Sequence, residues 1–422
     1  MLRISQFSIL NCQFSTLNSP SMSALTHKSI LITGSAGFIG ANLVKRLLKD
    51  MTEGTLIGLD NLNNYYDVSL KEYRLKELDT YYSQLTNSQL TLNSKPSTLN
   101  YKFIKGSLSD KSLVDSLFEQ YHFDIVVNLA AQAGVRYSIE NPDAYIESNI
   151  IGFYNILEAC RHSKDLAAKN SELTTLTSPL TLNSKPSTLN YRGVQHLVYA
   201  SSSSVYGGNT KVPFSTDDNV DHPVSLYAAT KKSNELFAHC YSKLYDIPTT
   251  GLRFFTVYGP AGRPDMAYFG FTNKLLKGET IQIYNYGNCR RDFTYVDDIV
   301  EGIVRVMAKA PIAKVPEPVE GPTTTLSTAP YAIYNIGGGQ PENLLDFVQT
   351  LQEELVRAGV LPKDYDFEAH KQLVPMQPGD VPTTYADATA LERDFGFIPK
   401  ITLREGLRKF AEWYKEYYKP LA

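Results

Sequence analysis

The sequence predicts an α/β protein built on a doubly wound parallel sheet, followed by a smaller domain. Short apolar runs alternate with amphipathic segments up to residue 254, as strands and helices alternate in such a sheet. The first apolar run leads directly into a glycine-rich turn. Beyond Phe254 the alternation gives way to turn-rich sequence. We therefore expect the first domain to span residues 28–258 and the second domain to span residues 259–422.

The composition restricts the kinds of protein that this chain can be. Of its 422 residues, 43% are hydrophobic and 20% are charged, which is typical of a globular protein with a large core. The net charge of −3 argues against a nucleic-acid partner, and no apolar run approaches the ~20 residues of a membrane span. The four cysteines lack metal-ligand spacing, so we expect free thiols in a reducing, cytoplasmic compartment and no metal site. Residues 1–27 are expected to form a loose extension, with Met22 as the true start.

A strand, a glycine turn and a helix open the first domain. Ser29–Thr33 is an apolar run that predicts a buried strand, and Ala41–Lys49 has the spacing of an amphipathic helix. Between them, Gly34, Gly37 and Gly40 permit a tight turn. In this context the N-terminus of the helix faces a pyrophosphate, so the segment is a candidate phosphate site of a dinucleotide.

The second strand ends in an acidic residue that indicates which dinucleotide binds. The strand Thr55–Leu59 leads to Asp60, twenty residues after Gly40. A carboxylate at this position accepts the ribose hydroxyls of NAD and would repel a 2′-phosphate. The polar and aromatic segment Asn61–Lys71 is expected to be a loop near the adenosine. The alternative is a strand–turn–helix with a purely structural role.

The rest of the first domain continues the alternation. Further strands are expected at Lys102–Lys105, Asp124–Leu129, His196–Ala200 and Thr249–Phe254. The small residues of 130–134 would let the backbone approach a ligand closely. A helix is expected at Asp143–Arg161, because its apolar residues recur at helical spacing.

Two polar groups follow at the ligand-binding edge of the predicted sheet. Ser201–Ser204 comes at the carboxyl end of a strand, where open α/β sheets bind ligands. Tyr227 and Lys231 stand four residues apart, so on a helix they face the same space. Because a nearby cation lowers the pKa of a phenol, the pair is a candidate base for a sugar or alcohol hydroxyl. The alternative is an amphipathic helix with a buried tyrosine and a solvated lysine.

Repeated polar segments interrupt the alternation. Leu90–Tyr101 and Leu180–Tyr191 have the same sequence, L-T-L-N-S-K-P-S-T-L-N-Y, which offers little to bury. Each copy lies between a helix and the next strand, where only a few residues are needed. We interpret the two copies as inserted loops of about residues 87–100 and 168–191, and the proline-rich stretch 311–330 as a third. The alternative is a lid or a partner-binding loop.

The second domain is expected to hold the substrate. Its predicted elements are the helices Phe269–Lys277, Asp297–Met307, Pro341–Ala358 and Leu403–Tyr418 and the strand Tyr331–Ile336. The adjacent Arg290 and Arg291 suit a pyrophosphate, because guanidinium groups meet phosphates bidentately. The alternative is a solvated pair of arginines.

With these pieces in place, the chain resembles the extended short-chain dehydrogenase/reductase family, the Rossmann-type NAD-dependent epimerases and dehydratases. Within this family it is most similar to the UDP-glucuronate 4-epimerases. The resemblance runs from about Lys28 to Tyr418, apart from the three insertions. It rests on the segments T-G-S-A-G-F-I-G, D-N-L-N-N-Y-Y-D-V-S-L-K, L-A-A-Q-A-G-V-R-Y-S, S-S-S-S-V-Y-G, Y-A-A-T-K, G-R-P-D-M, R-R-D-F-T-Y-V-D-D and Q-P-G-D-V-P-T-T-Y-A-D.

The resemblance implies roles for individual residues. The residues implied to bind NAD are Gly34, Gly37, Phe38, Ile39, Gly40, Asp60, Asn61, Leu129, Ala130, Ala131, Lys231 and Phe255. The residues implied to be catalytic are Tyr227 as the base, Lys231 as the cation that lowers its pKa, and Ser202 at the 4-oxygen of the sugar. The residues implied to bind the substrate are Ser202, Ser203, Ser204, Tyr227, Arg136, Arg263, Arg291 and Asp380.

Two of these implications carry an open question. Arg263 is expected to meet a sugar carboxylate, with Arg136 as the second choice, but Arg263 could instead pair with Asp265 or lie in solvent. The family usually has Gly-Asp after the third strand, where this chain has Gly106-Ser107. That departure removes an expected adenine contact and puts the affinity for the cofactor in doubt.

The implied reaction is the 4-epimerisation of a UDP-sugar through a 4-keto intermediate, by a homodimer, with UDP-glucuronate as the expected substrate. The alternatives are a UDP-glucose/UDP-galactose 4-epimerase, a nucleotide-sugar dehydratase or decarboxylase of the same fold, and a non-catalytic NAD sensor. Dehydratases and decarboxylases of the family carry an acidic residue just before V-Y-G, where this chain has Ser203 and Ser204. A sensor would not need Tyr227, Lys231 and Ser202 together.

Overall fold

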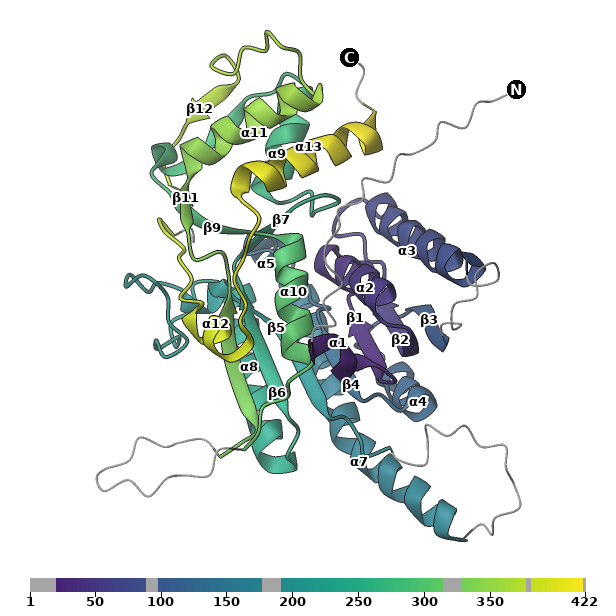
Figure 1. Cartoon of the computed structure of the whole chain (residues 1–422). Helices are drawn as coiled ribbons and strands as arrows, with labels where there is room; N and C mark the ends of the chain where they lie inside the picture. Colours follow the sequence, from purple (N-terminus) through teal and green to yellow (C-terminus); the bar gives the residue numbers. More distant parts are fainter. Residues whose placement is uncertain (1–19, 89–97, 177–190, 314–327, 377–380, 420–422) are drawn as a thin grey trace, which may run out of the picture.

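The computed structural model describes residues 20–88, 98–176, 191–313, 328–376 and 381–419. Its centre is a seven-stranded sheet in the order β10-β6-β5-β4-β1-β2-β3, and all neighbouring strands run parallel (Figure 1). The strands are β1 (Ser29–Thr33), β2 (Glu53–Asp60), β3 (Thr98–Lys105), β4 (Ile125–Asn128), β5 (His196–Ser202), β6 (Thr249–Phe254) and β10 (Tyr331–Ile336). The prediction of a doubly wound parallel sheet is confirmed.

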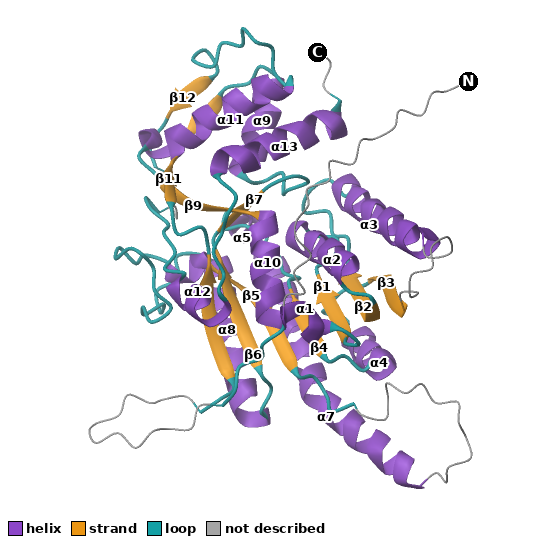
Figure 2. Ribbon diagram, viewed as in Figure 1, coloured by secondary structure: helices purple, strands orange, loops and turns teal. Residues whose placement is uncertain are grey.

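Helices cover both faces of this sheet (Figure 2). One layer contains α1 (Pro20–Leu25), α2 (Phe38–Asp50), α3 (Ser69–Ser88) and α10 (Val296–Met307), and the other contains α4 (Lys111–Tyr121), α7 (Gly152–Leu176) and α8 (Leu226–Tyr245). Side chains alternate between the layers, as the period of a strand requires: Ile30 and Ile32 join the first core, and Leu31 joins the second. Strands buried on both faces explain why the sequence shows continuous apolar runs.

Short segments connect these layers to the ligand-binding edge of the sheet. They are α5 (Tyr137–Glu140), α6 (Pro142–Tyr145), a π-helical turn η1 (Ile146–Ile151) and a 3₁₀ turn η2 (Ser203–Tyr206). The predicted helix Asp143–Arg161 is therefore divided into three pieces, and its last piece continues to Leu176. This corrects the sequence prediction, because residues 168–176 were assigned to an insertion and are helical.

The smaller unit packs above the carboxyl edge of the large sheet, at the top of Figure 1. Its elements are β7 (Thr256–Tyr258), α9 (Ala267–Leu276), β8 (Ile281–Ile283), η3 (Tyr284–Gly287), β9 (Arg290–Tyr295), β11 (Pro341–Asn343), α11 (Leu344–Ala358), β12 (Lys371–Leu373) and α13 (Leu403–Tyr418). The strands form the small sheets β11-β9-β7 and β12-β8. Aromatic rings of α9 and α13 share the core, with Phe269 and Phe410 at 5.7 Å between centroids.

The predicted boundary after residue 258 is wrong for three elements. β10 lies in the large sheet, where Tyr331 pairs with Thr249 and Ile336 with Phe254. The helix α10 packs on α2, and the helix α12 (Thr389–Phe395) packs on β10 and α10. The chain thus returns to the first unit after having entered the second. The added strand covers the edge of β6, which would otherwise expose a row of unpaired backbone groups.

Other local predictions also need correction. Pro20–Leu25 is a helix whose Leu25 is fully buried, so the extension is not loose at this point; residues 1–19 lie outside the described residues. Pro341–Asn343 is the strand β11, paired antiparallel with β9, and not the start of a helix. The parts of the three predicted insertions at residues 89–97, 177–190 and 314–327 lie outside the described residues.

The first repeat contributes to the sheet, which its polar composition did not indicate. β3 begins at Thr98, inside the repeat, and Leu99 is 6% exposed. Leu99 pairs with Gly54 of β2, and its carbonyl accepts a hydrogen bond from the Tyr82 hydroxyl at 3.1 Å. The loop prediction for the segment 87–100 is therefore wrong at its end, and also at its start, where Asn87 and Ser88 belong to α3.

Leu99→Ala is expected to lower the free energy of unfolding by about 2–4 kcal/mol, because it removes buried methyl groups and leaves a cavity. Denaturation by urea measures this change. Asn100→Ala, at the exposed neighbouring position, is the matched control and should change stability by no more than about 0.5 kcal/mol. Equally small effects at both positions would contradict a structural role for the repeat.

Candidate active site

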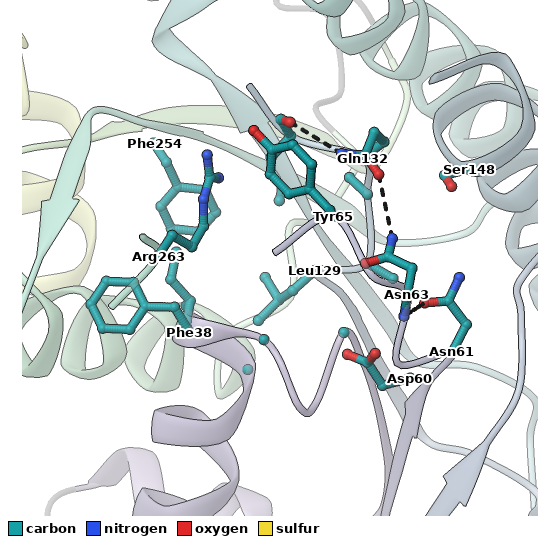
Figure 3. A pocket seen from close by; sticks show the side chains of 18 of the residues that line it. Phe38, Asp60, Asn61, Asn63, Tyr65, Leu129, Gln132, Ser148, Phe254 and Arg263 are labelled. Carbon is teal, nitrogen blue, oxygen red and sulfur yellow. Dashed lines mark hydrogen bonds between the residues drawn. The ribbon is translucent and has the colours of Figure 1, made fainter. Parts of the chain in front are cut away.

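Two cavities meet at the carboxyl edge of the large sheet. The first follows the ends of β1, β2, β4 and β5, and the second extends toward the smaller unit. The residues that line both are Tyr65, Ser202, Tyr227, Phe254, Phe255, Arg263 and Met266. Figure 3 shows Asp60 and Asn61 on one side of the first cavity and Arg263 and Phe254 on the other. The shared wall is where groups bound in the two cavities would meet.

The glycine turn between β1 and α2 forms one end of the first cavity. Gly34 has a φ of +68°, and a Cβ there would lie 2.8 Å from the backbone nitrogen of Ala130, so only glycine fits without a shift. The N-cap of α2 is Gly37, which provides no capping side chain. The first N–H groups of a 13-residue helix are thus available to an anion at the cavity wall.

An acidic and a basic residue face each other at the end of β2. Asp60 is 8% exposed, and its carboxylate accepts hydrogen bonds from the backbone nitrogens of Ala36 (3.2 Å) and Leu62 (2.8 Å). The Lys71 ammonium lies 3.7 Å from Asp60 and donates to Asn63 at 2.8 Å. These contacts fix the carboxylate in the cavity wall, in a position suited to ribose hydroxyls.

The structure brings all the predicted cofactor residues to the first cavity. Its lining includes Gly34, Gly37, Phe38, Ile39, Gly40, Asp60, Asn61, Leu129, Ala130, Ala131, Lys231 and Phe255. A free helix N-terminus, a close glycine turn and a fixed carboxylate together fit a dinucleotide without a 2′-phosphate. Sequence reasoning did not single out Asn63, Tyr65, Lys71, Gln132 and Ser148, which also line this cavity. They lie in irregular segments or helices without a recognisable spacing.

The unusual Ser107 also lines the first cavity. Its hydroxyl lies 2.8 Å from that of Ser109, which donates at 2.8 Å to the carboxylate of Glu147. Two hydroxyl groups therefore connect the cavity to a carboxylate where the family usually has an aspartate. The departure leaves a polar group at this position, although not a charged one.

The helix α8 positions Tyr227 and Lys231. Its N-cap Ser225 accepts a hydrogen bond from the Ala228 backbone nitrogen at 3.1 Å, which fixes the start of the helix just before Tyr227. One turn further on, the buried Lys231 ammonium donates to the Ala200 carbonyl of β5 at 2.9 Å. Burial lowers the pKa of Lys231 to about 8.

Burial and three neighbouring residues set the pKa of the Tyr227 phenol. Burial raises its pKa, a hydrogen bond with Ser202 and the charge of Arg263 lower it, and the charge of Asp265 raises it. Ser202 is 7% exposed at the end of β5. Lys231, the cation predicted to lower this pKa, is not among the groups that set it, and its ammonium is bound to the Ala200 carbonyl instead. The cation in the electrostatic environment of Tyr227 is Arg263, which the spacing of Tyr227 and Lys231 could not indicate.

A buried ionic network is hydrogen-bonded to Ser201, near the end of β5. Glu235 of α8 accepts two hydrogen bonds from Arg253 of β6, at 2.8 and 3.0 Å, and one from Ser201 at 2.7 Å. Arg253 also donates to the Tyr206 hydroxyl at 3.0 Å, and Tyr206 donates in turn to Asn335 of β10. The charges are paired and hydrogen-bonded, as buried charges require. The network joins α8, β5, η2, β6 and β10, and it includes Ser201, the neighbour of Ser202 on β5.

The second cavity contains most of the predicted substrate residues. Its lining includes Ser202, Ser203, Ser204, Tyr227, Arg136, Arg263 and Arg291. The Arg136 guanidinium lies 5.4 Å from the centre of the Tyr284 ring, and Arg291 donates to the Pro382 carbonyl at 3.1 Å. Asp380 lies outside the described residues.

Arg263 has a partner within its own turn. Its Nε donates to Oδ1 of Asp265 at 3.0 Å and its Nη2 donates to Oδ2 at 2.6 Å. The pairing left open by the sequence is thus present. The hydroxyl of Tyr65, 200 residues earlier, donates to the same Oδ2 at 3.1 Å. The contribution of Tyr65 was missed, because this residue lies far from Arg263 in the sequence and belongs to no pattern of local spacing.

The fold and site together define a dinucleotide-dependent enzyme of the α/β class. The chain belongs to the NAD dependent epimerase/dehydratase family, whose sequence pattern matches residues 30–320. This confirms the resemblance noted in the sequence. Among the described residues, no helix has the length and apolarity needed to cross a membrane.

Three known proteins illustrate the similarity. The chain is 47% identical over 390 residues to Protein CapI of Staphylococcus aureus, covering 92% of this chain and 99% of that protein. It is 41% identical over 391 residues to the probable UDP-glucuronate 4-epimerase of Rhizobium meliloti, covering 92% and 97%. The crystal structure of the UDP-glucuronic acid 4-epimerase from Bacillus cereus, in complex with UDP-glucuronic acid and NAD, matches with a TM-score of 0.68 and 28% identity. That match covers 92% of this chain and 100% of the solved chain.

Proposed function

We propose that this protein catalyses the NAD-dependent 4-epimerisation of UDP-glucuronate to UDP-galacturonate. The observation that carries the proposal is the position of Arg263 beside Tyr227 in the wall shared by the two cavities. A base for a sugar hydroxyl and a cation for a sugar carboxylate then face the same space. The relatives and the solved structure named as UDP-glucuronate 4-epimerases support the same substrate.

The chemistry that NAD supplies when bound is the removal and return of a hydride at C4 of the sugar. Tyr227 takes the proton of the 4-hydroxyl in the oxidation and returns it in the reduction. Ser202 hydrogen-bonds the 4-oxygen in both steps and keeps it beside Tyr227. The residues that would hold the cofactor are those of the first cavity, with Asp60 at the adenosine ribose and the start of α2 at the pyrophosphate.

Epimerisation requires the 4-keto sugar to turn over between the two hydride transfers. The residues of the second cavity, outside the shared wall, would hold the UDP group while the sugar turns. Ser203 and Ser204 form the turn η2 after Ser202 and present no carboxylate for an elimination. This favours epimerisation over the dehydratase and decarboxylase alternatives.

The test is to assay the purified protein with UDP-glucuronate and UDP-glucose side by side and to read the C4 configuration by proton NMR. UDP-galacturonate from UDP-glucuronate is the expected result. Faster formation of UDP-galactose from UDP-glucose would favour the second candidate, a UDP-glucose 4-epimerase, since one solved structure with that name matches at a TM-score of 0.66. A UDP-pentose as the sole product would identify a decarboxylase.

We also propose that the protein is a homodimer in a reducing, cytoplasmic compartment. Exposed apolar side chains line adjacent surfaces of η1, α7 and α8; they are Ile151, Tyr154, Leu236 and Leu244. Leu236 and Leu244, 58% and 65% exposed, lie two turns apart on one face of α8. An apolar face of this kind supports contact with a second copy. The free thiols of Cys160, Cys240 and Cys289 support the compartment.

Leu236→Glu combined with Leu244→Glu is expected to convert the dimer into a monomer, because the charges would be buried without partners in the interface. Light scattering coupled to gel filtration measures the mass. Ser116→Glu, at an exposed position of α4, is the control and should leave the mass unchanged. A dimer that survives the double substitution would show that the interface lies elsewhere.

A further inference from the structure

Arg263, Asp265 and Tyr65 form a cluster at the junction of the two cavities. Arg263 lines both cavities, and Asp265 lines the second. The ion pair keeps contact with solvent, since the two side chains are 26% and 30% exposed. Tyr65 reaches the cluster from the loop after β2, and its ring lies 4.8 Å from that of Tyr137. The cluster thus connects a loop of the first unit to the turn that carries Arg263.

The geometry of the pair leaves part of the guanidinium available. An arginine side chain has five N–H donors, and Asp265 occupies one on Nε and one on Nη2. One donor on Nη1 and the second donor on Nη2 form the other edge, which can receive a carboxylate end-on. Arg263 can therefore hold Asp265 and a ligand carboxylate at once. Two carboxylates on one cation carry a net negative charge, so the second is bound more weakly than it would be alone.

We propose that Asp265 is a positioning residue that limits how strongly Arg263 holds the carboxylate of the sugar, so that the 4-keto intermediate can turn over. This inference rests on the proposed function. If Arg263 had no other partner, it would bind the sugar carboxylate more strongly. The 4-keto intermediate would then turn over more slowly, because a bidentate contact would have to break in a partly desolvated site. With Asp265 in place, the guanidinium keeps a partner when the sugar carboxylate leaves, which lowers the cost of release.

Tyr65 holds Asp265 in the position that this role needs. Its hydroxyl donates to Oδ2, the oxygen that also accepts from Nη2 of Arg263. The site around Tyr65 is confined: a Cβ on Gly134 would lie 2.5 Å from the Tyr65 hydroxyl oxygen. The Tyr65 hydroxyl is therefore packed closely against Gly134, and Asp265 cannot turn away from it without losing a hydrogen bond.

The decisive variant is Asp265→Asn, which removes the charge and keeps the shape. We expect the NAD-loaded variant to bind UDP-glucuronate about fivefold more tightly than the wild type, the size of a partly exposed charge interaction. We expect no change for UDP-glucose, which has no carboxylate. Isothermal titration calorimetry measures both affinities. Both epimers carry the same carboxylate, so partial turnover during the titration does not hide the effect.

In turnover assays, kcat and KM for UDP-glucuronate should fall together and leave kcat/KM within about twofold. That is the signature of an interaction that is stronger in the ground state than in the rate-limiting step. Asp79→Asn on α3, an exposed position, is the matched control and should change neither constant. A residue with only a structural role would instead raise KM or lower the stability of the protein.

A second variant separates an effect through Arg263 from direct repulsion between Asp265 and the ligand. In the Arg263→Ala background, Asp265→Asn removes the repulsion between Asp265 and the sugar carboxylate and so tightens binding, but it should leave kcat unchanged, because there is no guanidinium to release. An equal fall of kcat in both backgrounds would overturn the proposal. For Asp265→Asn alone, weaker binding, equal shifts for both sugars or an unchanged kcat would also overturn it. A wild-type protein that neither binds nor turns over UDP-glucuronate would instead refute the proposed function itself.

Discussion

Tyr227→Phe is expected to keep the fold and the bound NAD and to lose about 100-fold or more of the turnover, as removal of a positioned acid–base group does. The phenylalanine ring fills the same space, so the start of α8 and its cap at Ser225 should be unaffected. Only the hydroxyl that faces Ser202 is lost. No other phenol in the wall shared by the cavities has both Ser202 and Arg263 among the groups that set its pKa, within the part of the chain that the structure describes.

The measurement is kcat for UDP-glucuronate by NMR, together with the NAD content of the purified protein. Tyr121→Phe, at the end of α4 and away from the cavities, is the control for a generic loss of a tyrosine hydroxyl. Turnover near that of the wild type in a well-folded Tyr227→Phe protein would remove Tyr227 from its assigned role. Loss of NAD with the activity would indicate a binding role instead.

Features that depend on neighbouring residues could be predicted from the sequence. β1, β6, β10 and α13 have the predicted bounds. The glycine turn and Asp60 follow from local backbone requirements, and the structure places them around one cavity with the other predicted cofactor residues. Tyr227 and Lys231 share a helix, so their common direction follows from the helical period. In each case a few consecutive residues contain the whole signal.

Features that depend on distant parts of the chain could not be predicted. The strand at Tyr331–Ile336 was recognised, but its place beside β6 is set by a pairing across about 80 residues that no local pattern encodes. Leu99 lies in a polar repeat and is buried only because β2 is its neighbour. The contact between Tyr65 and Asp265 joins two loops that are 200 residues apart. The pairing of Arg263 with Asp265 could be considered from the sequence, but the contact of Tyr65 with this pair could not be predicted from spacing.

Arg263→Ala is expected to reduce kcat/KM for UDP-glucuronate at least roughly tenfold more than kcat/KM for UDP-glucose, since a charge-assisted contact is made only with the carboxylate. The ion pair strengthens this expectation. Without the guanidinium, Asp265 remains in the cavity wall as an unpaired negative charge and repels the sugar carboxylate. UDP-glucose, which is neutral at C5, does not meet this repulsion.

The same variant should change the products. An arginine that orients the carboxylate also keeps it away from the geometry in which a β-keto acid loses CO₂, so Arg263→Ala is expected to release some UDP-pentose from the 4-keto intermediate. NMR of the reaction mixture detects both sugars. Arg136→Ala is the matched control, because Arg136 also lines the second cavity but lies against the Tyr284 ring. Equal losses of kcat/KM on the two substrates would show that Arg263 does not bind the sugar carboxylate. A selective loss for UDP-glucuronate in Arg136→Ala alone would assign that role to Arg136.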